Sequence, residues 1–96
     1  MDLVVTYDVN TETKAGRRRL RKVAQICQNY GQRVQLSVFE CRVGPLEMER
    51  LRNELEETID DDRDSLRIYR LSGSRDRVVV TMGRDTYVNY DDPLIG

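Results

Sequence analysis

The order in which hydrophobic periodicity changes along the chain constrains its fold more than any other feature. Residues 3–9, LVVTYDV, are rich in β-branched side chains and are typical of a buried strand. Residues 14–30 repeat instead with the period of a helix, with one apolar arc made of Leu20, Val23, Ala24, Ile26, Cys27 and Tyr30. Asn10, Thr11 and Thr13 are candidate caps for the start of this helix, and Gly31 is a typical end.

The next segment, residues 33–43, alternates like a strand but changes phase. Its apolar residues occupy even positions up to Val38 and odd positions from Phe39 onward. A strand buried on one face keeps its phase, so the slip predicts either a bulge or bend near Val38 or a segment covered on both faces. Helices on one side of a sheet cover only one face, and a partner subunit would be a natural cover for the other.

The second half of the chain predicts one more helix and two more strands. Gly44-Pro45 is a typical helix start, and the apolar stripe after it consists of Met48, Leu51, Leu55 and Ile59. Strands are expected at residues 66–71 and 78–83, and residues 85–96 form a weak strand or a loose tail. The economical packing is an α+β two-layer sandwich of ferredoxin-like type over residues 1–84, with a separate C-terminal segment at 85–96. Counting residues 33–43 as one strand or two decides whether the βαββαβ order is complete.

Length and composition exclude several classes of protein. The 96 residues make one small domain, which would gain stability from dimerisation. The chain has no histidine, which excludes histidine-based catalysis and ordinary zinc sites. Cys27 and Cys41 fit free buried thiols in a reducing compartment better than a single disulfide. No apolar run approaches the roughly 20 residues that span a bilayer, so no membrane association and a cytoplasmic location are expected.

Positive charge is concentrated at the start of the first helix. Residues 1–45 carry eight basic and four acidic side chains, a net charge of +4, and five of the six residues from Arg17 to Lys22 are basic. Positive charge at a helix N-terminus interacts unfavourably with the helix macrodipole, and a bound anion would compensate for it. These residues therefore form either a phosphate site or a solvated basic face. Arg19 differs because it lies among the apolar positions and points toward the sheet; Arg33 is a candidate to join it.

Asp8 stands near the end of a strand otherwise suited to burial. It shares a strand face with Val4 and Thr6, where an ionised carboxylate must be solvated, paired or bound to a cation. Capping of the next loop or a contact with an arginine would satisfy it. Magnesium is the other possibility, but it commonly takes one or two carboxylates and no second acid stands beside Asp8. Two copies of Asp8 across a two-fold axis would supply both.

Three further side chains are less specific candidates. Tyr7 and Phe39 could stack on nucleic-acid bases or fill the core. Ser37 could donate to a phosphate or be a small residue at a bend, and without histidine it has no evident activating base.

Four motifs occur in order over residues 2–83: the strand end YDV, the arginine-rich helix, GQRVQ and SVFE. In this order and spacing the chain resembles the small CRISPR-associated nuclease-like family that works beside the CRISPR integrase. The resemblance is close to the subset found with subtype I-C systems.

The resemblance implies a homodimer with apposed sheets and one Mg²⁺ or Mn²⁺ held between Asp8 of each chain. It also implies roles in substrate contact or the dimer cleft for Tyr7, Arg17, Arg19, Arg33, Ser37 and Phe39. Segment 85–96 would match the family's extra strand, which crosses onto the partner.

Two functions from different classes follow from the resemblance. The first is a metal-dependent endonuclease of single-stranded RNA or double-stranded DNA in spacer acquisition, slow because no side chain is a convincing general base. The alternative is a non-catalytic adaptor that clamps duplex DNA and docks the integrase, and would bind DNA in EDTA without cutting it. An RNA binder of the RRM kind is disfavoured, because LRIYRL and VVVTMG lack its basic-aromatic signature.

Overall fold

The β-branched run near the N-terminus becomes a central strand of the sheet. The computed structural model describes residues 1–88. Its elements, in chain order, are β1 (Asp2–Asp8), α1 (Lys14–Gln28), β2 (Gly31–Gln35), β3 (Val38–Arg42), α2 (Pro45–Thr58), β4 (Ser65–Arg70) and α3 (Arg75–Val78). The first six follow the βαββαβ order, which confirms the predicted ferredoxin-like fold class.

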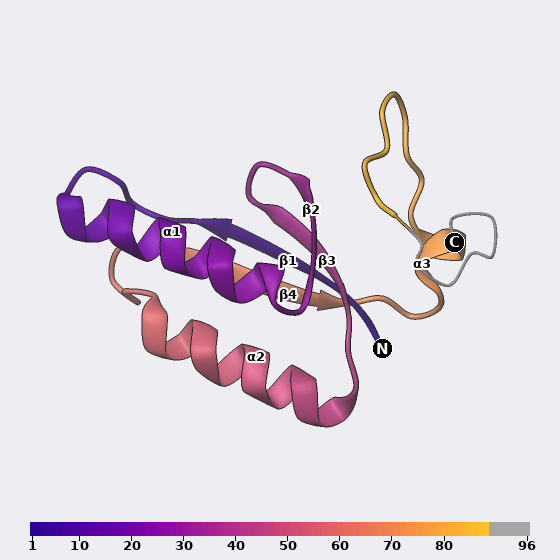
Figure 1. The fold of residues 1–96 in the computed structure, drawn as a ribbon, viewed down its shortest axis with the longest axis horizontal. Coiled ribbons are helices and arrows are strands. Elements are labelled where there is room, and N and C mark those ends of the chain that lie inside the picture. Colours follow the sequence, from indigo (N-terminus) through magenta and orange to yellow (C-terminus); the bar gives the residue numbers. More distant parts are fainter. Residues whose placement is uncertain (89–96) are drawn as a thin grey trace.

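The sheet has four strands in the order β2-β3-β1-β4, and every neighbouring pair is antiparallel. Helices α1 and α2 run side by side along it (Figure 1). Alternate residues of β1, namely Leu3, Val5 and Tyr7, are buried together with apolar residues of both helices. The residues between them face the other way. The sheet therefore has a helix-covered face and an open face.

The core between sheet and helices contains both cysteines. Cys27 of α1 and Cys41 of β3 are buried free thiols, as the sequence favoured. Burial raises the pKa of Cys27 to about 11 and that of Cys41 to about 12, so both stay protonated and unreactive near neutral pH.

The phase slip in residues 33–43 marks a reversal of the chain. β2 and β3 form an antiparallel hairpin that turns at Leu36 and Ser37, and its register shifts between Arg33 and Gln35. The bend predicted near Val38 is therefore real, and it separates two strands. A chain that changes direction can bury a new set of positions without any second cover.

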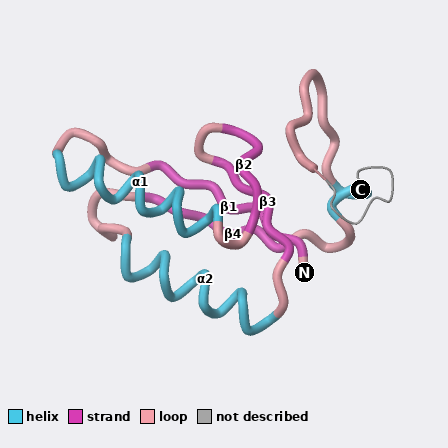
Figure 2. Tube along the Cα trace, viewed as in Figure 1, coloured by secondary structure: helices cyan, strands magenta, loops and turns pink. Residues whose placement is uncertain are grey.

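The strand predicted at residues 78–83 is wrong. Residues 75–78 form the short helix α3, and residues 79–88 contain no strand (Figure 2). A β-branched run becomes a strand only beside another strand, and within residues 1–88 none pairs with this segment. Val80 and Met82 are 83% and 89% exposed. The strand predicted at 85–96 lies outside the described residues from 89 onward, and residues 85–88 are not in a strand.

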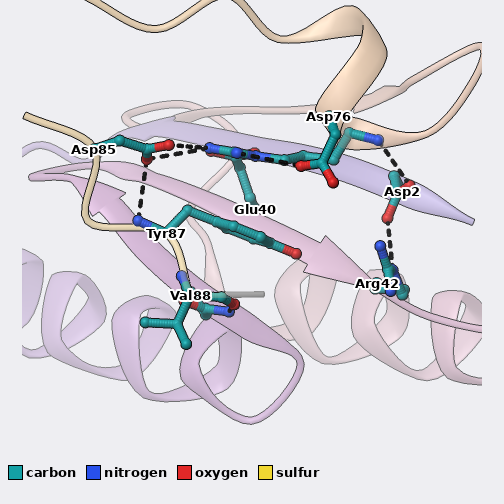
Figure 3. A network of polar contacts seen from close by, with 9 residues as sticks. Asp2, Glu40, Arg42, Asp76, Asp85, Tyr87 and Val88 are labelled. Atoms are coloured by element: carbon teal, nitrogen blue, oxygen red, sulfur yellow. Dashed lines mark hydrogen bonds and ion pairs between the residues drawn. The ribbon is translucent and has the colours of Figure 1, made fainter. Parts of the chain in front are cut away.

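Ion pairs fasten the segment after β4 to one end of the open face (Figure 3). The buried Arg75 donates through Nε to Glu40 Oε1 of β3 at 2.7 Å and through its terminal nitrogen to Asp85 at 3.2 Å. Its guanidinium lies 4.0 Å from the Tyr87 ring centroid. The side chain of Gln32 exchanges two hydrogen bonds with the main chain of Val88. This segment thus covers the end of the open face at Glu40 and leaves the end at Asp8 uncovered.

Candidate functional site

Asp8 lies on the open face of the sheet, as the alternation of β1 predicted. Pairing with β4 sets Asp8 opposite Ser65 and Thr6 opposite Arg67. Residues directly opposite each other in antiparallel strands point to the same side. Two adjacent rows of polar side chains from β1 and β4 therefore stand together on this face.

The carboxylate of Asp8 is exposed and has no ion pair or side-chain hydrogen bond within residues 1–88. It opens into a shallow hollow of about 320 Å³, whose lining consists of Thr6, Tyr7, Asp8, Ser65, Arg67 and Tyr69. Neither the predicted loop cap nor the predicted arginine partner satisfies Asp8 in this part of the chain. Its oxygens are available to a cation.

The chain that leaves Asp8 is fixed by a second acid, Asp64. The side chain of Asp64 is fully buried and accepts hydrogen bonds from the backbone N–H of Asn10 at 3.0 Å and of Asp60 at 2.8 Å. It also accepts from Arg19 Nε at 2.8 Å. One carboxylate therefore joins the β1–α1 loop, the α2–β4 loop and α1 next to the end of β1.

Charge and hydrogen bonding decide the ionisation of Asp64. Burial acts to raise the pKa of its carboxyl, but the hydrogen bonds from Arg19, Asp60 and Asn10 outweigh it, and the pKa lies below its ordinary value. Sequence analysis missed this residue. The acidic run at 60–64 was the available signal, but only the fold distinguishes Asp64 from its exposed neighbours.

Gly16 brings α1 against the same loop. It is buried in the first turn, where Thr13 caps the helix by accepting from Gly16 N at 3.0 Å. A Cβ on residue 16 would overlap the backbone carbonyl of Asn10. The helix start is thus packed tightly against the segment that follows Asp8.

The side chains of Tyr7, Phe39 and Arg33 come together on the helix-covered side of the sheet, and Asp8 lies on the opposite face. The Tyr7 and Phe39 rings stack with centroids 6.3 Å apart, and the Arg33 guanidinium lies 5.2 Å from the Phe39 ring. Phe39 is fully buried, and the buried Tyr7 hydroxyl has no hydrogen-bond partner within residues 1–88. Ser37, in the hairpin turn, accepts from Tyr7 N through its backbone carbonyl.

The two arginines predicted on the first helix differ in their surroundings. Arg17 is exposed and donates to the carbonyl of Thr11 at 3.3 Å. Arg19 is 18% exposed and, as its helical position predicted, points inward, where Asp64 binds it. Its nitrogen donors serve the fold, whereas Arg17 presents its charge to solvent.

A metal ion would find only part of a site in one chain. Within residues 1–88, no group of three or more cysteine, aspartate or glutamate side chains is close enough to hold an ion. Asp8 provides hard oxygen donors of the kind that Mg²⁺ and Mn²⁺ prefer, with the Ser65 hydroxyl beside it. The chemistry of these donors fits such an ion, and one chain supplies a single carboxylate to it.

Comparison with known families decides the relationship of the chain. The family described as CRISPR associated protein Cas2 matches residues 1–79. The chain belongs to the Cas2 family. Family membership confirms the resemblance carried by the YDV, GQRVQ and SVFE motifs.

Several Cas2 relatives are similar over almost their whole length. The chain is 48% identical over 95 residues to the CRISPR-associated endoribonuclease Cas2 1 of Moorella thermoacetica, with 99% of each chain covered. It is 50% identical over 95 residues to the CRISPR-associated endonuclease Cas2 of Halalkalibacterium halodurans, again with 99% of each chain covered. A crystal structure of Streptococcus pyogenes Cas2 superposes with a TM-score of 0.77 at 54% identity, covering 86% of this chain and 100% of that one.

No helix within residues 1–88 of this Cas2 chain is both long and apolar enough to cross a membrane.

Proposed function

We propose that this Cas2 chain is an endonuclease of CRISPR immunity, that it cuts phosphodiester bonds in double-stranded DNA or single-stranded RNA, and that it acts in spacer acquisition. The single observation that carries the proposal is the unpartnered Asp8 carboxylate on the open sheet face. The names of relatives at 48% and 50% identity, an endoribonuclease and an endonuclease, support the reaction, and the first of them names RNA as a substrate.

The active species is a homodimer in which two open faces meet and the two Asp8 side chains hold one divalent ion. A lone chain offers one carboxylate, and a two-fold axis supplies the second from the same position of the partner. Bound Mg²⁺ or Mn²⁺ would polarise a phosphoryl oxygen and lower the pKa of a coordinated water.

The residues of the chain itself orient and neutralise the substrate. Asp64 holds the backbone beyond Asp8, so that the carboxylate projects from a fixed strand end. Arg17 offers positive charge to the substrate phosphates. Tyr7, Arg33, Ser37 and Phe39 retain proposed roles at the substrate or dimer cleft, and Arg19 acts by holding Asp64. Without a strong general base, turnover is slow.

The test replaces the carboxylate and retains its shape. Asp8→Asn should abolish cleavage of labelled duplex DNA and single-stranded RNA in Mg²⁺ or Mn²⁺, while sedimentation shows the same mass as the unaltered protein. Asp62→Asn is the matched control, since Asp62 is an exposed acid that does not line the hollow at Asp8, and this variant should cut normally. Undiminished cleavage by Asp8→Asn would refute the metal mechanism.

The second candidate function is a non-catalytic adaptor that clamps duplex DNA and bridges the CRISPR integrase dimers. The observation in its favour is the exposed basic start of α1, which faces solvent without an acidic residue in its first turn. Stable DNA binding in EDTA with no cutting in any divalent ion would favour the adaptor over the nuclease.

The proposal also covers the family subset, the protein partners and the cellular location of the chain. The YDV, GQRVQ and SVFE motifs support membership of the subtype I-C-like subset. Residues 85–96, beyond a domain of residues 1–84, would pack on the partner subunit, and the exposed Val80 and Met82 just before them support an apolar contact there. The integrase is the second protein partner, and the cytoplasm is the proposed location, in keeping with the two free thiols.

A further inference from the structure

One positively charged side chain that lines the hollow at Asp8, Arg67, was not singled out from the sequence. Arg67 of β4 lies directly across from Thr6, one row from the Asp8–Ser65 pair. Within residues 1–88 its guanidinium forms no ion pair, although Arg19, Arg52 and Arg75 all do. A positive group thus stands beside the free carboxylate without neutralising any acid of the described chain.

Arg67 is held in place by a neutral group. Its terminal nitrogen donates to the Tyr69 hydroxyl at 3.0 Å, two residues along the same face of β4. An arginine has five N–H donors, and this hydrogen bond uses one of them. The remaining donors of an oriented guanidinium fork suit the paired oxygens of a phosphate group.

Hydroxyl groups complete the surroundings. Ser65 and Thr6 line the hollow between Arg67 and Asp8. Arginine, serine, threonine and tyrosine side chains are common donors to nucleic-acid phosphates. These residues are exposed or half-buried in the single chain and line the same hollow as Asp8, so a nucleic acid that reaches the shared ion of the proposed dimer also reaches them.

We propose that Arg67, oriented by Tyr69 and assisted by Ser65, binds a backbone phosphate of the nucleic acid next to Asp8. This inference rests on the proposed function, since it places the phosphate beside the reacting bond. It assigns β4 to substrate binding, together with β1. In a homodimer each chain would contribute one such site beside the shared ion.

Binding in EDTA tests the site without cleavage. We would measure the affinity of Arg67→Ala for a fluorescein-labelled DNA duplex and, separately, for labelled single-stranded RNA, over a series of salt concentrations. Removing one charge-assisted hydrogen bond should weaken binding about tenfold. For each phosphate that Arg67 no longer neutralises, the slope of log K against log salt should become shallower by about 0.9 for duplex DNA or about 0.7 for a single strand.

Arg70→Ala is the matched control. Arg70 is an exposed arginine of the same strand, but it pairs with Leu3, whose side chain is buried on the helix-covered side. It should leave affinity and slope unchanged, and Arg67→Lys should keep most of the slope. Equal losses of affinity for Arg67→Ala and Arg70→Ala, or no loss for Arg67→Ala, would overturn the proposal. The arm that loses affinity identifies whether DNA or RNA supplies the phosphate.

The two proposals can fail separately. Binding that depends on Arg67 in a protein that never cuts would refute the nuclease and leave the phosphate site intact. If the unaltered protein cuts in a metal-dependent way and the Arg67→Ala variant binds nucleic acid normally, the phosphate site is refuted and the nuclease stands.

Discussion

At the scale of single residues, the geometry of the site depends on Asp64 as much as on Asp8. Asp64→Ala removes a buried acceptor from three donors and leaves Arg19 and two backbone N–H groups without their partner. We expect the free energy of unfolding to fall by about 2–4 kcal/mol, measured by urea denaturation. Asp62→Ala removes the same charge at an exposed position of the same acidic run and should change it by less than about 0.5 kcal/mol. Equal effects would contradict the role assigned to Asp64.

The ionisation of Asp64 also predicts a pH dependence. Its pKa in the folded chain is below the ordinary value, so its stabilisation is complete above the unfolded pKa of about 3.9 and is lost as pH falls through the lower folded value. The difference in unfolding free energy between the unaltered chain and Asp64→Asn should therefore be largest near about pH 7 and shrink in acid. A difference that stays constant down to about pH 3 would show that ionisation of Asp64 does not contribute.

Residue-level prediction succeeded where local periodicity decides direction. Strand alternation set Asp8 apart from the core, and helical periodicity turned Arg19 inward. The partner of Arg19 lies 45 residues away. No local pattern links such positions, because the contact exists only once β4 has paired with β1. For the same reason, Arg67 gave no signal in the sequence.

At the scale of elements, the start of α1 is the most constrained junction near the site. Gly16→Ala should destabilise the chain by about 1–3 kcal/mol, because the added methyl overlaps the Asn10 carbonyl and the loop must shift. Thermal unfolding measures this effect. Ala15→Ser adds one atom at an exposed position of the same turn and should change stability by less than about 0.5 kcal/mol. A neutral Gly16→Ala would mean that the loop after Asp8 is not held by α1.

The hairpin and the C-terminal segment show how far hydrophobic pattern determines elements. The slip at Val38 correctly indicated a break, because a reversal of direction resets which positions are buried. The run VVVTMG has the composition of a strand, but residues 1–88 provide no strand to pair with it. Composition states what a segment could form, and the presence of a neighbouring strand decides whether it does.

At the scale of the whole molecule, one chain carries only part of the proposed metal site. Net charge was uninformative, since a value of −1 conceals a basic first half and an acidic second half. The fold class was predictable from the order of elements. The phase slip of residues 33–43 and the lone Asp8 suggested a second chain, the apposition of two sheets came from the resemblance to the family, and both stay predictions.

Metal stoichiometry tests the central claim most directly. Isothermal titration calorimetry of the purified protein with Mn²⁺ gives the number of ions bound per chain, and sedimentation gives the number of chains in each particle. We predict about one Mn²⁺ for every two chains, lost in Asp8→Asn while the dimer remains. One ion for each chain, or binding that survives Asp8→Asn, would contradict a site shared between two Asp8 carboxylates.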